Sequence, residues 1–105
     1  MPILMPQSAY LSTPVVISGY LYTNDLATTG IRLDTPAWFT WLALGYTFYY
    51  QTRVGAFTAR REPRRQRYFW YAFRRVQGRL RKVYLGTSAR LTRETLDRAA
   101  AQLIL

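Results

Sequence analysis

The sequence predicts an α+β fold: an antiparallel sheet of three to four strands packed on a C-terminal helix, with a short preceding helix. The 105 residues include nine Tyr, five Phe and three Trp, and these residues, with many Val and Thr, favour strands. Residues 36–44 and 93–104 carry helix start signals and apolar side chains at helical spacing. Half of the residues are hydrophobic, so a chain of this length can bury a core.

The N-terminal segment, residues 1–34, is predicted to be an arm with a possible strand, which precedes a basic sheet-and-helix domain over residues 35–105. Prolines interrupt the apolar residues 1–14 three times. After them we expect one strand over Val15–Thr23 with a bulge at Gly19, a loop over Asn24–Gly30 and a short extended piece over Ile31–Leu33.

A first helix is predicted over residues 36–44. Thr35 can accept a hydrogen bond at the N-cap, and Pro36 falls where its missing N–H costs nothing. Gly45 suits the residue that follows the C-cap. The apolar face consists of Trp38, Trp41 and Leu42, and we interpret both tryptophans as core anchors rather than a ligand box.

Four strand-like runs follow, separated by turn residues. The glycine of Gln77-Gly78 marks a tight turn between the last two runs, and Pro63 cannot donate to a strand ladder. The expected order is strand Tyr46–Gln51, turn Thr52–Gly55, strand Ala56–Glu62, loop Pro63–Gln66, strand Arg67–Val76, turn Gln77-Gly78 and strand Arg79–Leu85.

The C-terminal helix is predicted over residues 93–104, after a loop over Gly86–Arg90. Thr92 is the expected N-cap, and Glu94 lies in the first turn, where the helix dipole favours an acid. Leu91 and Leu96 occupy the positions of a hydrophobic staple. The apolar face that should pack on the sheet comprises Leu96, Ala99, Ala100, Leu103 and Ile104.

The composition argues against an enzyme. The chain has no cysteine and no histidine, so it lacks thiolate ligands, the usual general base and the commonest metal ligand. Its tyrosines are accompanied by no partner base, Gly-rich phosphate loop or oxyanion-hole motif. We therefore expect a binding protein with no catalytic residues, no cofactor and no metal.

The charge is distributed unevenly. Residues 1–52 carry one base and two acids, whereas residues 53–105 carry fourteen bases and three acids. Ten of the eleven bases within residues 53–82 are arginines, which suit bidentate contacts to phosphate or guanine. This asymmetry predicts a polyanionic partner on one side of the molecule; a basic surface that is merely solvated is the alternative.

No segment predicts a membrane protein. The longest apolar stretch, Ala37–Tyr50, is too short to span a bilayer and contains Gly45. The first residues, Met1–Gln7, have two prolines and no basic region, unlike a secretory signal. A cytoplasmic protein with no membrane partner is therefore expected.

The Gln77-Gly78 turn sets a register in which opposed residues share a face. Trp70 should oppose Leu85 and Ala72 should oppose Val83, which gives an apolar face for the C-terminal helix. The opposite face mixes aromatic and basic side chains, as nucleic-acid platforms do. An alternative is that these aromatics form a second core layer under the N-terminal half. The mixed face comprises Phe69, Tyr71, Phe73, Arg75, Lys82 and Tyr84.

Three segments carry a resemblance to a known family. They are Phe57-Thr-Ala-Arg-Arg-Glu62, Tyr68-Phe-Trp-Tyr-Ala-Phe-Arg-Arg75 and Gly78-Arg-Leu-Arg-Lys-Val-Tyr-Leu-Gly86, with Leu91-Thr92 and an Ala-rich helix after them. This pattern resembles the arm-site DNA-binding domain at the N-terminus of phage and transposon tyrosine integrases. It is also similar to a small bacterial domain that stands alone or precedes helix-turn-helix regulators, as is the helix Trp38-Phe-Thr-Trp-Leu42.

The resemblance covers about residues 35–104 and implies three strands that pack on one helix and enter the major groove of DNA. About 45 residues precede the matching strands, and no recombinase catalytic domain is present, so no strand exchange is implied. By position, the contact residues would be Arg74, Arg75, Arg79, Arg81 and Lys82.

The resulting prediction is a module that binds double-stranded DNA through a basic hairpin and sheet face, in a mobile element or a transcription context. Arginines of the 63–67 loop would hold phosphates, and Arg79 and Arg81 would read guanine edges. One rival is a protein-interaction or self-association module that uses Trp38, Trp41 and the N-terminal half. Another is an RNA-binding protein. The predicted nucleic-acid-binding residues are Arg60, Arg64, Arg65, Arg67, Tyr71, Arg74, Arg75, Arg79, Arg81, Lys82 and Tyr84.

Overall fold

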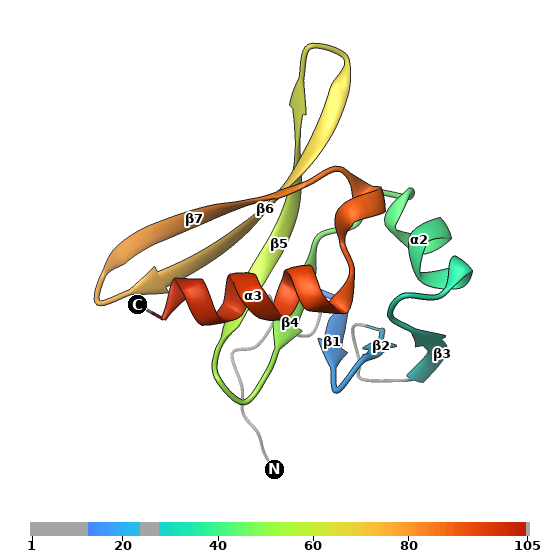
Figure 1. The fold of residues 1–105 in the computed structure, drawn as a ribbon, viewed down its shortest axis with the longest axis horizontal. Helices are drawn as coiled ribbons and strands as arrows, with labels where there is room; N and C mark the ends of the chain where they lie inside the picture. Colours follow the sequence, from blue (N-terminus) through green and yellow to red (C-terminus); the bar gives the residue numbers. More distant parts are fainter. Residues whose placement is uncertain (1–12, 24–27, 105) are drawn as a thin grey trace.

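The computed structural model describes residues 13–23 and 28–104, and the expectations for residues 1–12 and 24–27 lie outside them. The α+β class is confirmed, but the described residues form seven strands rather than three to four, in one sheet of order β3-β2-β1-β4-β5-β6-β7 (Figure 1). The strands are β1 Val15–Ile17, β2 Tyr20–Tyr22, β3 Thr28–Arg32, β4 Phe48–Gln51, β5 Ala56–Arg64, β6 Arg67–Val76 and β7 Arg79–Gly86. The helices are α2 Pro36–Leu42 and α3 Arg93–Leu103, and a short 3-10 turn spans Ser88–Arg90.

The N-terminal half adds strands beside the C-terminal sheet. The single strand predicted over Val15–Thr23 is wrong, because Ser18 and Gly19 adopt φ of 52° and 83° and turn the chain into the β1–β2 hairpin. The predicted loop is also wrong over residues 28–30, which belong to β3; the ladder between β2 and β3 is irregular. β1 pairs in parallel with β4, so residues on both sides of position 34 share one sheet.

Helix α2 forms where the sequence predicts it and ends two residues earlier, at Leu42. Thr35 caps it by accepting from the Trp38 backbone N–H at 3.4 Å. The Trp38 indole is fully buried, stacks on Trp41 and meets Phe48 edge-on. Its Nε1 donates to the Leu91 carbonyl at 2.8 Å, which satisfies the polar atom of a buried ring. Trp38 is therefore the core anchor that the helical spacing indicates.

The C-terminal strands largely follow the prediction, with two corrections. The predicted loop over Pro63–Gln66 is a tight turn at Arg65-Gln66, and Pro63 pairs with Tyr68 inside the β5–β6 ladder. This proline lies beyond Ala59, the last β5 residue paired with β4, so β5 is one side of a two-stranded ribbon there and tolerates the missing donor. The predicted Trp70–Leu85 pairing is shifted by one residue, and Trp70 pairs with Gly86.

Helix α3 packs along the sheet through Leu96, Ala99, Ala100 and Leu103, which are all buried. Thr92 caps it by accepting from the Thr95 N–H at 3.3 Å. Ile104, expected on the same face, is instead the C-cap residue and lies exposed.

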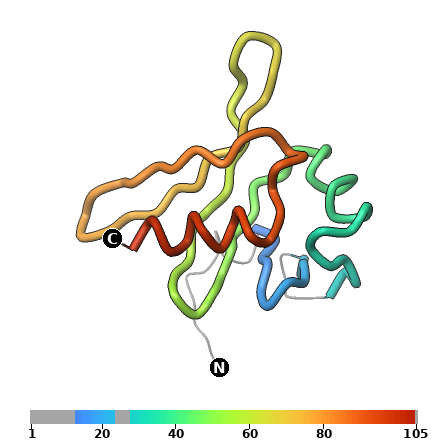
Figure 2. Tube along the Cα trace, viewed as in Figure 1, coloured from blue at the N-terminus to red at the C-terminus, as the bar shows by residue number. Residues whose placement is uncertain are grey.

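Both helices lie on one face of the sheet. Side chains from α2, α3, β4, β5 and β6 join one core cluster, in which Phe48 contacts both Trp38 and Trp70. Figure 2 shows two hairpins that project from the sheet, and α3 runs beside one of them, β6–β7. The N-terminal half extends the sheet at its edge rather than lying under β5–β7, so the described residues do not bear out the alternative of a second core layer. None of their helices is long or apolar enough to cross a membrane.

Candidate nucleic-acid interface

The face of β5, β6 and β7 opposite the helices combines bases with aromatic rings, and we call it the open face. The register of the strands determines which residues lie on this face, because directly opposed residues share a face. Arg60 pairs with Tyr71, which pairs with Tyr84; Thr58 pairs with Phe73, which pairs with Lys82. With the remaining alternate residues, the open face comprises Thr58, Arg60, Glu62, Arg64, Arg67, Phe69, Tyr71, Phe73, Arg75, Leu80, Lys82 and Tyr84.

The cations of the open face lie over its rings. The Arg60 Cζ is 4.3 Å from the centroid of Phe73, and the Lys82 Nζ is 4.4 Å from that of Tyr71. The Arg64 Cζ is 5.8 Å from the same Tyr71 ring. At exposed sites each such contact contributes only about 0.5–1 kcal/mol, so the rings orient the charges without immobilising them. Phe73 keeps only 8% of its surface exposed and lies beneath these charged groups, whereas Leu80 and Tyr84 are exposed on the same face.

One acid, Glu62, lies among the five bases of the open face. Its Oε1 is 3.1 Å from the Lys82 Nζ and 3.5 Å from the Arg64 Nη2. These exposed ion pairs contribute little stability. They leave the surface with a net positive charge, carried by Arg60, Arg64, Arg67, Arg75 and Lys82 against the one carboxylate.

The outer part of the β5–β6 hairpin, residues 62–69, pairs with neither β4 nor β7 and forms a two-stranded ribbon that we call the arm. It projects beyond the sheet in Figures 1 and 2. The Arg61 Cζ stacks 3.9 Å from the Tyr68 centroid, on the side away from the open face. A hollow of about 600 Å³ beside the arm is lined by Pro63, Arg64, Arg65, Arg67 and Phe69. Sequence analysis omits Arg61, although its place within the Arg60-to-Arg67 run could have indicated it.

The structure does not bring all predicted residues to the open face. Arg60, Arg64, Arg67, Tyr71, Arg75, Lys82 and Tyr84 share it, Arg65 lies at the tip of the arm and Arg79 flanks the β6–β7 turn. Arg74 and Arg81 pair with each other on the helix side. The Arg81 Nη1 donates to the Leu103 carbonyl at 3.4 Å, and the Arg74 Nη1 is buried without a hydrogen-bond partner. Both guanidinium groups thus lie toward the C-terminal end of α3, where the helix dipole favours cations.

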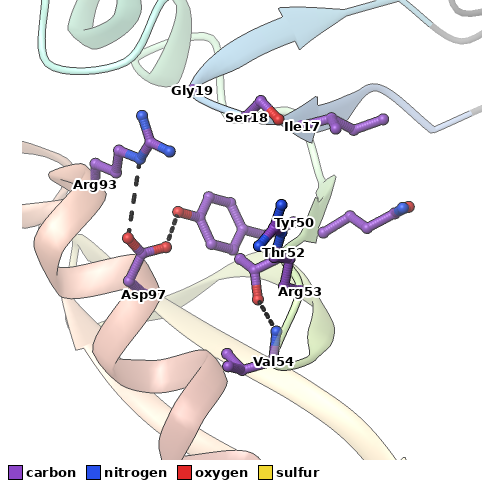
Figure 3. Close-up of a pocket in the computed structure, with 10 residues that line it drawn as sticks. Ile17, Ser18, Gly19, Tyr50, Thr52, Arg53, Val54, Arg93 and Asp97 are labelled. Carbon is purple, nitrogen blue, oxygen red and sulfur yellow. Dashed lines mark hydrogen bonds and ion pairs between the residues drawn. The ribbon is translucent and has the colours of Figure 1, made fainter.

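A second hollow, of about 580 Å³, lies between the β1–β2 turn, the β4–β5 turn and α3 (Figure 3). Within it the Tyr50 hydroxyl donates to the Asp97 Oδ1 at 2.5 Å, and the Arg93 Nε lies 3.8 Å from the Asp97 Oδ2. Burial, reinforced by the hydrogen bond to Asp97, raises the pKa of Tyr50 well above its ordinary value of 10. A tyrosine is protonated at neutral pH even at its ordinary pKa, and the raised pKa extends this protonated range toward alkaline pH. The phenol acts as a donor that joins β4 to α3.

No protein-family model matches the chain, and comparisons with curated proteins and with solved structures found no match. The described residues contain no group of three or more acidic side chains placed to hold a metal ion. The open face and the arm are therefore the features of the described residues that bear on function.

Proposed function

We propose that the protein binds double-stranded DNA through the open face. The observation that carries this proposal is the layer of guanidinium and ammonium groups standing over aromatic rings, on a three-stranded surface that no described helix covers. A β-ribbon is narrow enough to enter the major groove of B-DNA. Five bases against one carboxylate give this surface the positive charge that a phosphate backbone attracts.

The arrangement of the rings favours duplex DNA over single-stranded nucleic acid. Single-strand binding by stacking needs aromatic faces that bases can reach. Here Arg60 covers Phe73, and Lys82 and Arg64 lie near Tyr71; of the open-face aromatics, only Tyr84 is mostly exposed. The protein-interaction rival loses one of its residues, because Trp38 is buried in the core, whereas Trp41 is only partly buried.

The test is a fluorescence-polarisation titration of a 24-base-pair duplex at several salt concentrations. If the five open-face bases each neutralise one phosphate, the slope of log K against log salt should be roughly −4.5. Arg60→Gln removes the charge that stands over Phe73 and keeps a polar side chain at this position. It should weaken all duplexes alike and make the slope shallower by about one unit.

Arg98→Gln is the matched control, because it also removes one positive charge, from an exposed side chain of α3 that pairs with Glu94. Its slope should equal that of the wild type. Equal effects of both variants would mean that only net charge matters. Absence of salt-dependent binding to any duplex at low ionic strength, or tighter binding to an RNA hairpin than to DNA, would overturn the proposal.

A further inference from the structure

The tip of the arm has an unusual backbone. Three two-residue turns in the described chain have positive φ at both positions, and two of them end in glycine: Ser18-Gly19 and Gln77-Gly78, with φ of 83° and 80° at the glycines. The third, Arg65-Gln66, has φ of 50° and 69° with no glycine. A side chain in this left-handed region is strained, and glycine is the residue that relieves it. Of these three turns, Arg65-Gln66 has the most strained backbone, because neither of its residues is glycine, and yet both positions carry long polar side chains.

The arm also extends beyond the neighbouring strands of the sheet. β5 pairs with β4 only as far as Ala59, and β6 pairs with β7 only as far as Trp70, whereas the β5–β6 ladder continues to Arg64 and Arg67. Arg60 still lies on the three-stranded part of the open face, and from there to Arg65 at the tip β5 extends about 17 Å at the usual rise of a strand. Adjacent groove centres of B-DNA lie roughly half a helical turn apart, about 17 Å along the axis. A sheet seated in the major groove therefore has an arm long enough to reach the neighbouring minor groove.

The side chains at the tip fit the chemistry of that groove. A·T pairs present only acceptors in the minor groove, whereas G·C pairs add the amino donor of guanine. Arg65 offers five donors and no acceptor, and the Gln66 amide can donate as well. Arg64 and Arg67 flank the turn and add positive charge, which the potential of a narrow A·T minor groove attracts. No acidic residue lies at the tip, since Glu62 is held further back by Lys82.

We infer that Arg65 and Gln66, at the tip of the arm, read the minor groove of A·T-rich DNA beside the site held by the open face. This inference rests on the proposed function and assigns it a sequence preference. It also accounts for the absence of glycine at this turn, because a glycine would relieve the strain and remove a reading group.

The experiment compares three duplexes of equal length with alternating A·T, G·C and I·C pairs. Inosine lacks the 2-amino group, so I·C pairs present an A·T-like minor groove and a G·C-like major groove. The wild type should bind A·T and I·C duplexes alike, and both roughly tenfold more tightly than G·C, within the range that one well-placed contact supplies. Major-groove reading would instead group I·C with G·C.

Two variants of the tip separate reading from charge. Gln66→Gly should keep or raise the melting temperature, because it relieves the left-handed backbone, yet reduce the preference. Arg65→Lys keeps the charge and should leave G·C binding unchanged while reducing the preference for A·T and I·C. Gln77→Gly is the control, since it relieves a similar φ of 51° in the other hairpin and should leave the preference intact.

The possible failures are distinguishable. If no duplex binds at low salt, the proposed function itself fails. If all three duplexes bind equally, or if I·C groups with G·C, DNA binding stands but minor-groove reading by the arm is overturned. An unchanged preference in both tip variants would overturn it too.

Discussion

A single phenol joins the sheet to the C-terminal helix. Tyr50 comes from β4 and donates to Asp97 on α3, and Arg93 approaches the same carboxylate from the preceding turn of the helix. Because burial and the acceptor together raise the pKa of Tyr50, the protonated phenol is the form that the folded protein favours. This contribution to stability is present below the unfolded value near 10 and decreases as pH rises above it, since the unfolded chain then releases a proton that the folded chain retains.

Tyr50→Phe should therefore lower the free energy of unfolding by about 1–3 kcal/mol at neutral pH, the usual contribution of a hydrogen bond to a charged group. Urea denaturation followed by circular dichroism measures it. Between pH 9 and 11 the variant should lose less stability than the wild type. Tyr84→Phe, at an exposed position, is the control and should change neither quantity. Parallel pH profiles for wild type and Tyr50→Phe would contradict the account.

At the scale of residues, strand alternation predicts most of the open face, including the aromatic and basic residues Tyr71, Lys82 and Tyr84. It also places Arg74 and Arg81 on the opposite face, but it does not predict that they lie beside the end of α3. Their surroundings depend on how far α3 runs beside the β6–β7 hairpin, which is a property of tertiary packing rather than of local sequence. The contact between the Arg61 guanidinium and the Tyr68 ring likewise depends on how far the β5–β6 hairpin extends.

At the scale of elements, the small residues of α3 permit its close approach to the sheet. Ala99 and Ala100 are buried, whereas Ala101 on the same helix is exposed. Ala99→Leu should overpack this contact and cost about 1–3 kcal/mol. For a domain of this length each kcal/mol lowers the melting temperature by roughly 4–8 °C.

Ala101→Leu is the matched control, because it adds the same atoms to the solvent side of the helix. Thermal unfolding of both variants measures the difference. A melting temperature that falls equally for both, or for neither, would mean that α3 does not pack on the sheet through Ala99.

Elements with clear start and stop residues are predictable from the sequence. Thr35-Pro36, Thr92 and Gln77-Gly78 punctuate α2, α3 and the β6–β7 hairpin as expected. The Arg65-Gln66 turn is missed because Pro63 suggests a break and no glycine marks the true turn. The β1–β2 turn is missed for the opposite reason, since Gly19 interrupts an apolar run that otherwise looks continuous.

At the scale of the whole molecule, Trp38 links the two halves of the chain. Its ring contacts Phe48, and its indole N–H reaches the Leu91 carbonyl ahead of α3. Trp38→Phe leaves the buried Leu91 carbonyl without this donor and should lower the free energy of unfolding by about 1–3 kcal/mol. Because β1–β3 belong to the same sheet, unfolding should remain one transition.

Coincident urea curves from far-ultraviolet circular dichroism and tryptophan fluorescence would show that single transition. Separate midpoints for the two signals would instead indicate that the N-terminal strands unfold as an independent unit. The sequence cannot decide this point. The parallel pairing that places β1 against β4 joins Val15 to Tyr49, and no local signal encodes a contact between residues so far apart.

β7 has one further consequence for the molecule in concentrated solution. Among the described strands it is one of the two edge strands, with β3 at the other edge; it pairs with β6 and exposes Leu80 and Tyr84. A long, partly apolar border of this kind invites another copy to add its own strand and begin aggregation. Arg79, Arg81 and Lys82 lie along the same border, so an approaching copy would bring like charges into opposition. The cations of β7 thus also oppose self-assembly, and added salt weakens this repulsion by screening it.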